Sequence, residues 1–193
     1  MRALAIFQKK RYIITLILLV FPILATADYF DQKQLFGISL IHQSAGSNLS
    51  NGSSASNNGT GIGMYFDRYD QQTYRYNNSF NYIQYSGAEN FNIIELTMGA
   101  DFLIPVMMDS SLFAGMTVGA VMQKFSNENI TNAAIEPLYG VQFGGIKYLN
   151  ENFLLELGYR IRATNLTTND DVTNISSNLH ELNEFYFNLL FMY

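Results

Sequence analysis

The chain has 193 residues, a formal charge of −5, two histidines and no cysteine. Without cysteine, disulfide frameworks, thiolate metal sites and cysteine nucleophiles are excluded. Charged residues make up only 14% of the chain and hydrophobic residues 48%, whereas an ordinary soluble domain has roughly 25% charged residues. The hydrophobic content argues against disorder, and an acidic chain is unsuited to nucleic acid, whose phosphates require a basic surface.

The first 27 residues have the pattern of a cleavable secretory signal peptide. A basic start precedes an apolar run at 12–24, and Ala25-Thr26-Ala27 has the small–x–small pattern of a cleavage site. The alternative is a transmembrane anchor, but this run is shorter than the roughly 20 residues with which a helix crosses a bilayer. We therefore expect a signal peptide at 1–27 and a single domain at 28–193.

Nearly all of the remaining chain alternates between large apolar residues and small or polar ones, which is the pattern of β-strands. The segment at 73–85 alternates least regularly, because Asn78 and Gln84 interrupt its apolar face. Eight such segments are expected, at residues 36–40, 61–67, 73–85, 91–102, 111–123, 137–144, 152–162 and 184–193.

The composition of the second face decides between a soluble sheet and a membrane barrel. A soluble sheet buries its bulky residues and presents a charged face to water. Here the second face consists mainly of Gly, Ser, Thr, Asn and a few charges, which fit the narrow interior of an eight-stranded barrel, while the large apolar residues fit lipid. We therefore predict an all-β fold: an eight-stranded antiparallel up-and-down transmembrane β-barrel in a bacterial outer membrane.

The connections between the predicted strands alternate in character. Outer-membrane barrels have long loops outside the cell and tight turns in the periplasm, and an even number of strands returns both termini to the periplasm. We expect polar loops at 44–59, 86–90, 125–135 and 164–180, of which only the second is short, and tight turns at 70–72, 105–110 and 149–151.

Charged residues are also distributed by face. Arg68, Lys124 and Lys147 have lipid-facing parity and lie at strand ends, where long side chains can reach the membrane surface. Charges in the middle of strands have inward parity instead. This difference favours a barrel over a soluble sheet.

The inward charges are expected to form a polar network in the lumen. Strand order should bring Arg160 and Arg162 close to Glu184, with Glu95 also within their reach, and Arg75 close to Asp101. Paired charges in a narrow lumen satisfy one another, so we favour a structural plug over a gated pore. The predicted network comprises Arg75, Glu95, Asp101, Glu156, Arg160, Arg162 and Glu184.

The end of the chain resembles the final strand of bacterial outer-membrane barrels, which ends in an aromatic residue preceded by alternating apolar positions. The segment from Lys147 to Arg160 is similar to the turn and penultimate strand of the OmpA/OmpX-like and opacity-type small barrels. The resemblance implies contact with outer-membrane lipids and lipopolysaccharide, and recognition of the last strand by the barrel-assembly machinery. The matching residues of this assembly signal are Phe185, Phe187, Leu189, Phe191 and Tyr193.

Two histidines suggest an enzymatic alternative. His42 and His180 should lie near the outer rim, because the first and last strands are neighbours in a closed barrel. With Ser44, Glu181 and Glu184 nearby, they are the residue types of a Ser-His-acid hydrolase, and some eight-stranded barrels are lipid A deacylases or acyltransferases. We expect Ser44 to begin a Ser/Asn/Gly-rich loop, which is unsuited to hold a nucleophile.

The sequence therefore favours a membrane-embedded structural or surface-interaction scaffold over an enzyme. Loops on a rigid scaffold are where binding concentrates, and the polar segments 44–59 and 164–180 suit contact with host surfaces or external lipopolysaccharide. The alternatives are an outer-membrane lipid-modifying enzyme and a narrow channel for small solutes. No catalytic residue, metal site or cofactor is predicted.

Overall fold

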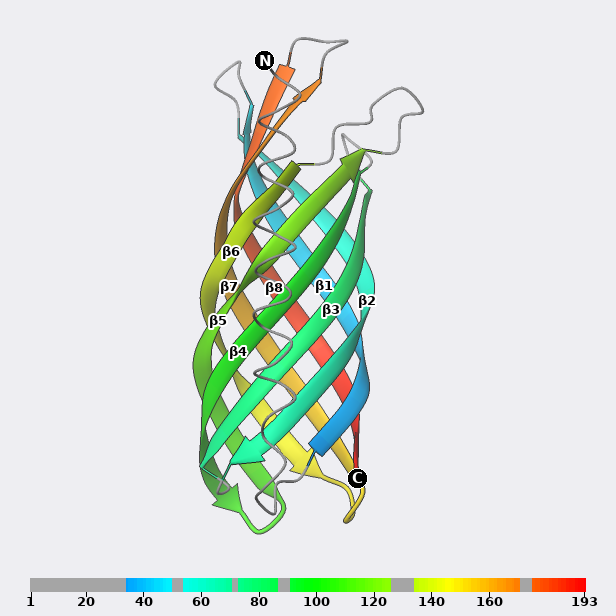
Figure 1. Cartoon of the computed structure of the whole chain (residues 1–193), viewed down its shortest axis with the longest axis vertical. Helices are drawn as coiled ribbons and strands as arrows, with labels where there is room; N and C mark the ends of the chain where they lie inside the picture. Colours follow the sequence, from blue (N-terminus) through cyan, green and yellow to red (C-terminus); the bar gives the residue numbers. More distant parts are fainter. Residues whose placement is uncertain (1–33, 50–53, 71–72, 87–90, 126–133, 171–174) are drawn as a thin grey trace, which may run out of the picture. The chain divides into compact units, whose positions relative to one another are not determined.

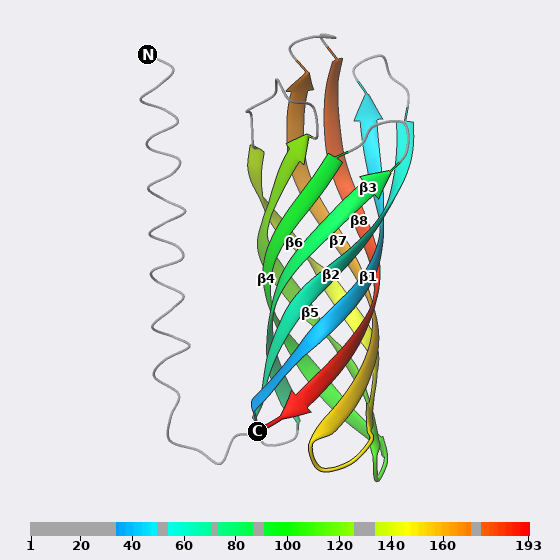
Figure 2. The same cartoon turned by 90° about the vertical axis from the view of Figure 1, so that its right-hand side faces the viewer.

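The structure, a computed structural model, describes residues 34–49, 54–70, 73–86, 91–125, 134–170 and 175–193. Eight antiparallel strands follow one another in chain order and close into a barrel, in which β1 also pairs with β8 (Figures 1 and 2). The predicted fold is thereby confirmed. The strands are β1 (Gln34–Leu49), β2 (Ser54–Asp70), β3 (Tyr74–Ser86), β4 (Phe91–Met107), β5 (Ser110–Phe125), β6 (Ala134–Tyr148), β7 (Phe153–Asp170) and β8 (Ile175–Met192).

The first described strand and the end of the chain meet at one end of the barrel, drawn at the bottom of Figure 1 and called the lower end. There the backbone N–H of Tyr193 donates to the carbonyl oxygen of Gln34 at 3.1 Å. The ends of β2, β4 and β6 and the starts of β3, β5 and β7 lie at this end. The turn expected at 105–110 is shorter than predicted, because β4 continues to Met107 and β5 begins at Ser110.

The outward face of the barrel is apolar. Met116 on β5 is 70% exposed and Phe187 on β8 is 37% exposed, so the bulky residues point away from the barrel axis, as predicted. The irregular segment β3 follows the same rule: Tyr76 and Phe80 are exposed while Arg75 is buried. The pairing of β3 with both neighbours runs without a register shift.

The strands at the opposite, upper end are longer than predicted. The expected loops at 44–59 and 164–180 are wrong, because β1, β2, β7 and β8 continue through most of both segments. Only 50–53 and 171–174, which lie outside the described residues, separate these strands. Hydrophobic alternation was the signal for a strand, and it disappears where polar residues stand on both faces, although backbone pairing continues.

Four neighbouring strands, β7, β8, β1 and β2, extend as a sheet above the others (Figure 2). The pairing of β2 with β3 ends at Asn58, but β2 begins at Ser54. The pairing of β6 with β7 ends at Thr164, but β7 continues to Asp170. Register shifts along both sides of β8 accompany this extension, as is usual where a sheet leaves a barrel.

Inward-facing apolar side chains close both ends of the interior. The predicted inward face was small, polar and charged, so these two layers were missed. The signal was the pair of consecutive apolar residues near strand ends, as in Ile93-Ile94 and Leu154-Leu155. The lower layer contains Leu35, Leu103, Phe113, Ile146, Leu154 and Leu190, and the upper layer Ile41, Ile83, Tyr85, Phe91, Ile93, Val121, Leu138 and Leu182.

The predicted signal peptide at 1–27 lies outside the described residues. Within those residues, no helix is long and apolar enough to cross a membrane.

Candidate functional site

The lower part of the polar interior is organised around Arg75 on β3. Its Nη2 lies 2.6 Å from Oδ2 of Asp101, and its Nη1 lies 3.1 Å from Oδ2 of Asp67 and also contacts Glu156. Asn77 donates a further hydrogen bond to Asp101 at 2.8 Å. All five side chains are buried. One arginine therefore holds together acids from three other strands, β2, β4 and β7.

Arg162 on β7 and Glu184 on β8 organise the upper part. Nη2 of Arg162 lies 2.6 Å from Oε2 of Glu184, and Nη1 lies 2.9 Å from Oε2 of Glu95 on β4, across the lumen. Gln43 on β1 donates to both carboxylates, at 3.0 and 3.1 Å. Its amide oxygen accepts a hydrogen bond from the hydroxyl of Tyr85. Side chains from five different strands are thereby linked.

Arg160 joins the two parts. Its Nη1 lies 2.9 Å from Oε1 of Glu184, and its Nε donates to Oε1 of Gln142 at 2.9 Å. Gln142 in turn donates to Oδ1 of Asp101 at 2.6 Å. The guanidinium also lies over the ring of Tyr186, 4.1 Å from its centroid, in a cation–π contact. An unbroken chain of contacts therefore runs from Asp101 to Glu184.

The structure brings together all the residues expected in the lumen network. Arg75 lies beside Asp101, and Arg160 and Arg162 lie beside Glu184, as strand order predicts. The neutral bridges Gln43 and Gln142 were not identified. The alternation of the strands places both residues on the inward face, but it does not indicate which partner a neutral side chain contacts.

Among the residues that the structure describes, the buried interior holds more acid than base. Two negative charges would be in excess if every group were ionised, and an unpaired buried charge is costly. No group of three or more His, Cys, Asp or Glu in the described residues is arranged to hold a metal ion. The buried acids are Asp67, Glu95, Asp101, Glu156 and Glu184, and the buried arginines are Arg75, Arg160 and Arg162.

The upper rim does not assemble the predicted hydrolase residues. His42 and Ser44 share the outward face of β1, whereas Glu184 points into the lumen and contacts two arginines. Oγ of Ser44 lies 3.3 Å from Oγ of Ser56, and within the described residues no hydrogen bond joins Ser44 to either histidine. The loop expected to begin at Ser44 is also wrong, because Ser44 lies inside β1. The residue types of a catalytic triad are present without its geometry.

The lower rim carries an ion pair outside the lumen. Nζ of Lys147, at the end of β6, lies 2.5 Å from Oδ2 of Asp109 in the β4–β5 turn, and the Ser110 hydroxyl donates to Oδ1 at 3.1 Å. The hydrogen bond from Lys147, with a further one from Ser110, lowers the pKa of Asp109. Lys147 is exposed at a strand end, as expected. Arg68 is half-buried near the end of β2, and the side chain of Lys124 lies outside the described residues.

The five residues of the predicted assembly signal share the outward face of β8 and its end. The Phe191 ring packs near the rings of Phe153 and Tyr193, with centroids 5.3 and 6.5 Å apart. None of the five belongs to the buried interior. The exposed set is Phe185, Phe187, Leu189, Phe191 and Tyr193.

Solved structures of similar architecture include outer-membrane proteins. Neisserial surface protein A has a TM-score of 0.61 at 12% identity, over 81% of this chain and 96% of that one. OprG from Pseudomonas aeruginosa has 0.54 at 9% identity, over 83% and 95%. AlkL, solved in lipid bilayers, has 0.52 at 12% identity, over 84% and 89%. No protein-family model and no curated protein matches the sequence, so the likeness is one of fold.

The apolar outer surface and this fold together define the class: the protein is a transmembrane β-barrel of the bacterial outer membrane. Its architecture is that of the small OmpA/OmpX-like barrels. Because such barrels keep tight turns and both termini in the periplasm, we infer that the lower end is periplasmic and the upper end extracellular.

Proposed function

We propose that the protein is a closed outer-membrane scaffold, neither a pore nor an enzyme, whose extracellular strand ends carry a polar interaction surface. The observation that carries this proposal is the filled lumen. Arg75, Arg160 and Arg162 are each at most 1% exposed, and apolar layers lie above and below them. A solute path requires a continuous wetted route, and the side chains that would line it are bonded to one another.

The extended upper sheet supports the interaction role. β7, β8, β1 and β2 rise above the other strands and are rich in Ser, Asn and Thr in this region. A polar surface held by a rigid barrel is suited to bind a ligand without reorganising the scaffold. We propose an external host ligand or the polar part of lipopolysaccharide as its partner.

Biogenesis supplies two further partners in this proposal. The secretion machinery recognises residues 1–27, and cleavage after Ala27 leaves Asp28 as the first residue of the mature chain. The barrel-assembly machinery then recognises the outward residues of β8. The intact mass of protein purified from outer-membrane fractions tests the cleavage site, and a mass that includes residues 1–27 contradicts it.

Planar-bilayer recording tests the closed lumen. The protein is first shown to be folded by heat-modifiable gel migration, and an open porin in the same membranes is the positive control. We expect no stable unitary currents. Stable, reproducible currents would overturn the scaffold in favour of a narrow channel.

Mass spectrometry of lipid A tests the enzymatic alternative. Cells with and without the protein should have the same acyl pattern, because in the part of the chain that the structure describes Ser44 contacts the Ser56 hydroxyl and no histidine by hydrogen bond. The contradicting result is a lipid A acyl pattern that changes when the protein is present, returns to the original pattern with Ser44→Ala, and stays changed with Ser56→Ala. Such a result would identify the protein as a lipid-modifying enzyme instead of a scaffold.

A further inference from the structure

The outward face of β6 has a gap near its periplasmic end. Tyr139, Val141 and Phe143 point outward, and the next outward position is Gly145. A Cβ added at Gly145 would lie 3.7 Å from Cδ2 of Leu112, with no closer neighbour. This is ordinary van der Waals contact, so packing does not require glycine here.

The adjacent Gly144, which faces the lumen, gives the contrast. A Cβ there would lie closer to the backbone oxygen of Leu157 and to the ring of Phe113 than real Cβ atoms ever do. Glycine at 144 is therefore imposed by the narrow interior, whereas glycine at 145 is not. The consequence of the missing side chain at 145 lies on the lipid-facing surface.

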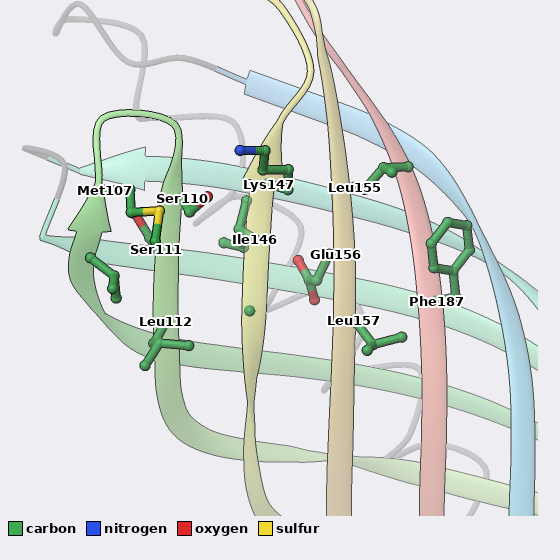
Figure 3. Close-up of a pocket in the computed structure, with 12 residues that line it drawn as sticks. Met107, Ser110, Ser111, Leu112, Ile146, Lys147, Leu155, Glu156, Leu157 and Phe187 are labelled. Atoms are coloured by element: carbon green, nitrogen blue, oxygen red, sulfur yellow. The ribbon is translucent and has the colours of Figure 1, made fainter.

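The gap at Gly145 opens into a groove of about 470 Å³ on that surface (Figure 3). Its outward walls are formed by Val106, Leu112, Leu157 and Phe187, from the strands on both sides of β6. Figure 3 shows Leu112 on one side of this strand and Leu157 and Phe187 on the other. Because the walls are apolar and face the bilayer, an acyl chain fits the groove.

The periplasmic end of the groove carries both signs of charge. Lys147 lines the groove, and its Nζ lies 2.5 Å from Asp109. Both side chains are about half-exposed. An ammonium has three N–H donors, and a carboxylate can accept several hydrogen bonds. The pair therefore retains donors and an acceptor for a headgroup at the membrane surface.

We propose that this groove binds one phospholipid of the periplasmic leaflet that has a phosphoethanolamine headgroup. One acyl chain lies over Gly145, a phosphate oxygen accepts from Lys147, and the lipid ammonium donates to Asp109. Because Asp109 neutralises Lys147, a net-anionic headgroup gains less here than a zwitterionic one. The proposal rests on the barrel spanning an outer membrane, whose other leaflet holds the lipopolysaccharide.

Native mass spectrometry tests the lipid site on the full-length mature protein extracted from outer membranes. Phosphatidylethanolamine and phosphatidylglycerol are added in equal amounts, and the wild type should retain one phosphatidylethanolamine in preference. Gly145→Leu fills the groove and should lower retention about tenfold, which corresponds to about 1.4 kcal/mol. The matched control is Ala100→Leu, at an exposed outward position of β4 that does not line the groove, and it should leave retention unchanged.

The charge of the headgroup is tested separately. Asp109→Asn leaves Lys147 as an uncompensated cation, so lipid preference should shift from phosphatidylethanolamine to phosphatidylglycerol while heat-modifiable migration stays the same. A purely structural ion pair would not produce this shift.

Three results would overturn the lipid site: equal retention of the two lipids by the wild type, retention unaffected by Gly145→Leu, or a dimer that Gly145→Leu dissociates. The last result would assign the groove to a second copy of the chain. Absence of the protein from outer-membrane fractions would instead overturn the proposed function, so the two failures are distinguishable.

Discussion

Arg75 and Asp101 occupy opposed positions on β3 and β4, and Nη2 of Arg75 lies 2.6 Å from Oδ2 of Asp101. The same guanidinium contacts Asp67 and Glu156. Arg75→Met keeps much of the side-chain volume but leaves three buried carboxylates without their cation. We expect the free energy of unfolding to fall by about 3–5 kcal/mol. Urea unfolding in detergent, followed by circular dichroism because the chain has no tryptophan, measures the change.

The control for this variant is Gln84→Met on the same strand. Gln84 is exposed on the outward face of β3, so methionine there should change the free energy of unfolding by less than about 0.5 kcal/mol. An equal fall in the free energy of unfolding for the two variants would contradict this explanation. It would show that any substitution in β3 has this effect, whether or not buried carboxylates lose their cation.

Different numbers of hydrogen bonds predict that two buried aspartates respond differently to neutralisation. Asp101 accepts from Arg75, Asn77 and Gln142, so Asp101→Asn should cost about 2–3 kcal/mol. Asp67 accepts from Arg75 through Oδ2 alone, and its Oδ1 makes no hydrogen bond among the described residues. Asp67→Asn removes one surplus negative charge and should cost less than about 1 kcal/mol.

Urea midpoints of the two aspartate variants, recorded side by side, provide this comparison. A larger loss for Asp67→Asn than for Asp101→Asn would contradict the hydrogen bonds assigned to the two carboxylates.

Hydrophobic alternation predicted the strands and their two faces because lipid imposes one simple rule on every outward side chain of a barrel. The same alternation assigned Arg160 and Glu184 to the inward face. Because their strands are neighbours in chain order, it also predicted that the two side chains meet. This rule applies only to the part of the barrel that lipid surrounds. Above the membrane, polar residues occupy both faces, and nothing in the hydrophobic pattern distinguished the continuing strands at 44–59 from a loop.

Contacts across the lumen were harder to predict than contacts between neighbouring strands. Glu95 on β4 was expected within reach of the two arginines of β7, but its contact with Arg162 in particular depends on how the strands tilt and stagger around a narrow interior. That stagger depends on the registers of all the strand pairs around the barrel together. It therefore cannot be inferred from the sequence of any single strand. The attachment of Glu156 to Arg75 has the same origin.

Gly144 and Gly145 are adjacent in sequence and should respond oppositely to alanine. A Cβ at 144 would overlap the backbone of β7, so Gly144→Ala should destabilise the barrel by about 1–3 kcal/mol or prevent folding. A Cβ at 145 meets Leu112 at 3.7 Å and the backbone oxygen of Ser111 at 3.9 Å, both ordinary contacts, so Gly145→Ala should stay within about 0.5 kcal/mol. Folding yield in detergent and urea midpoints measure both effects. Similar losses at the two positions would contradict the assigned faces.

The ion pair at the periplasmic rim predicts a local pH dependence. The hydrogen bond from Lys147 lowers the pKa of Asp109 below its ordinary value of 3.8. A carboxyl whose pKa is lower in the folded state stabilises that state above the unfolded pKa, and this contribution is lost as the pH falls through the folded pKa. The pKa is measured by carbon NMR of the Asp109 carboxyl during a titration from neutral to acid pH. We expect a pKa below the ordinary value of 3.8.

Variants of the two donors supply the comparison for Asp109. Lys147→Met should raise its pKa toward the ordinary value, and Ser110→Ala should raise it by less, in keeping with the smaller effect of that hydrogen bond. A pKa that does not respond to Lys147→Met would show that the pair does not persist in solution.

The aromatic end of the chain predicts a difference between folding in the cell and folding in detergent. Tyr193 is 69% exposed on the outward face, so its side chain contributes little packing, while its backbone N–H is held by Gln34. If the assembly machinery recognises this residue, Tyr193→Ser should lower the amount of protein in the outer membrane several-fold and leave refolding in detergent unchanged. Tyr139→Ser, which removes a 59% exposed outward tyrosine from β6, should affect neither. Heat-modifiable migration of outer-membrane fractions and of refolded protein measures both quantities. Equal losses for Tyr193→Ser in the cell and in detergent would assign the residue to barrel stability instead of assembly.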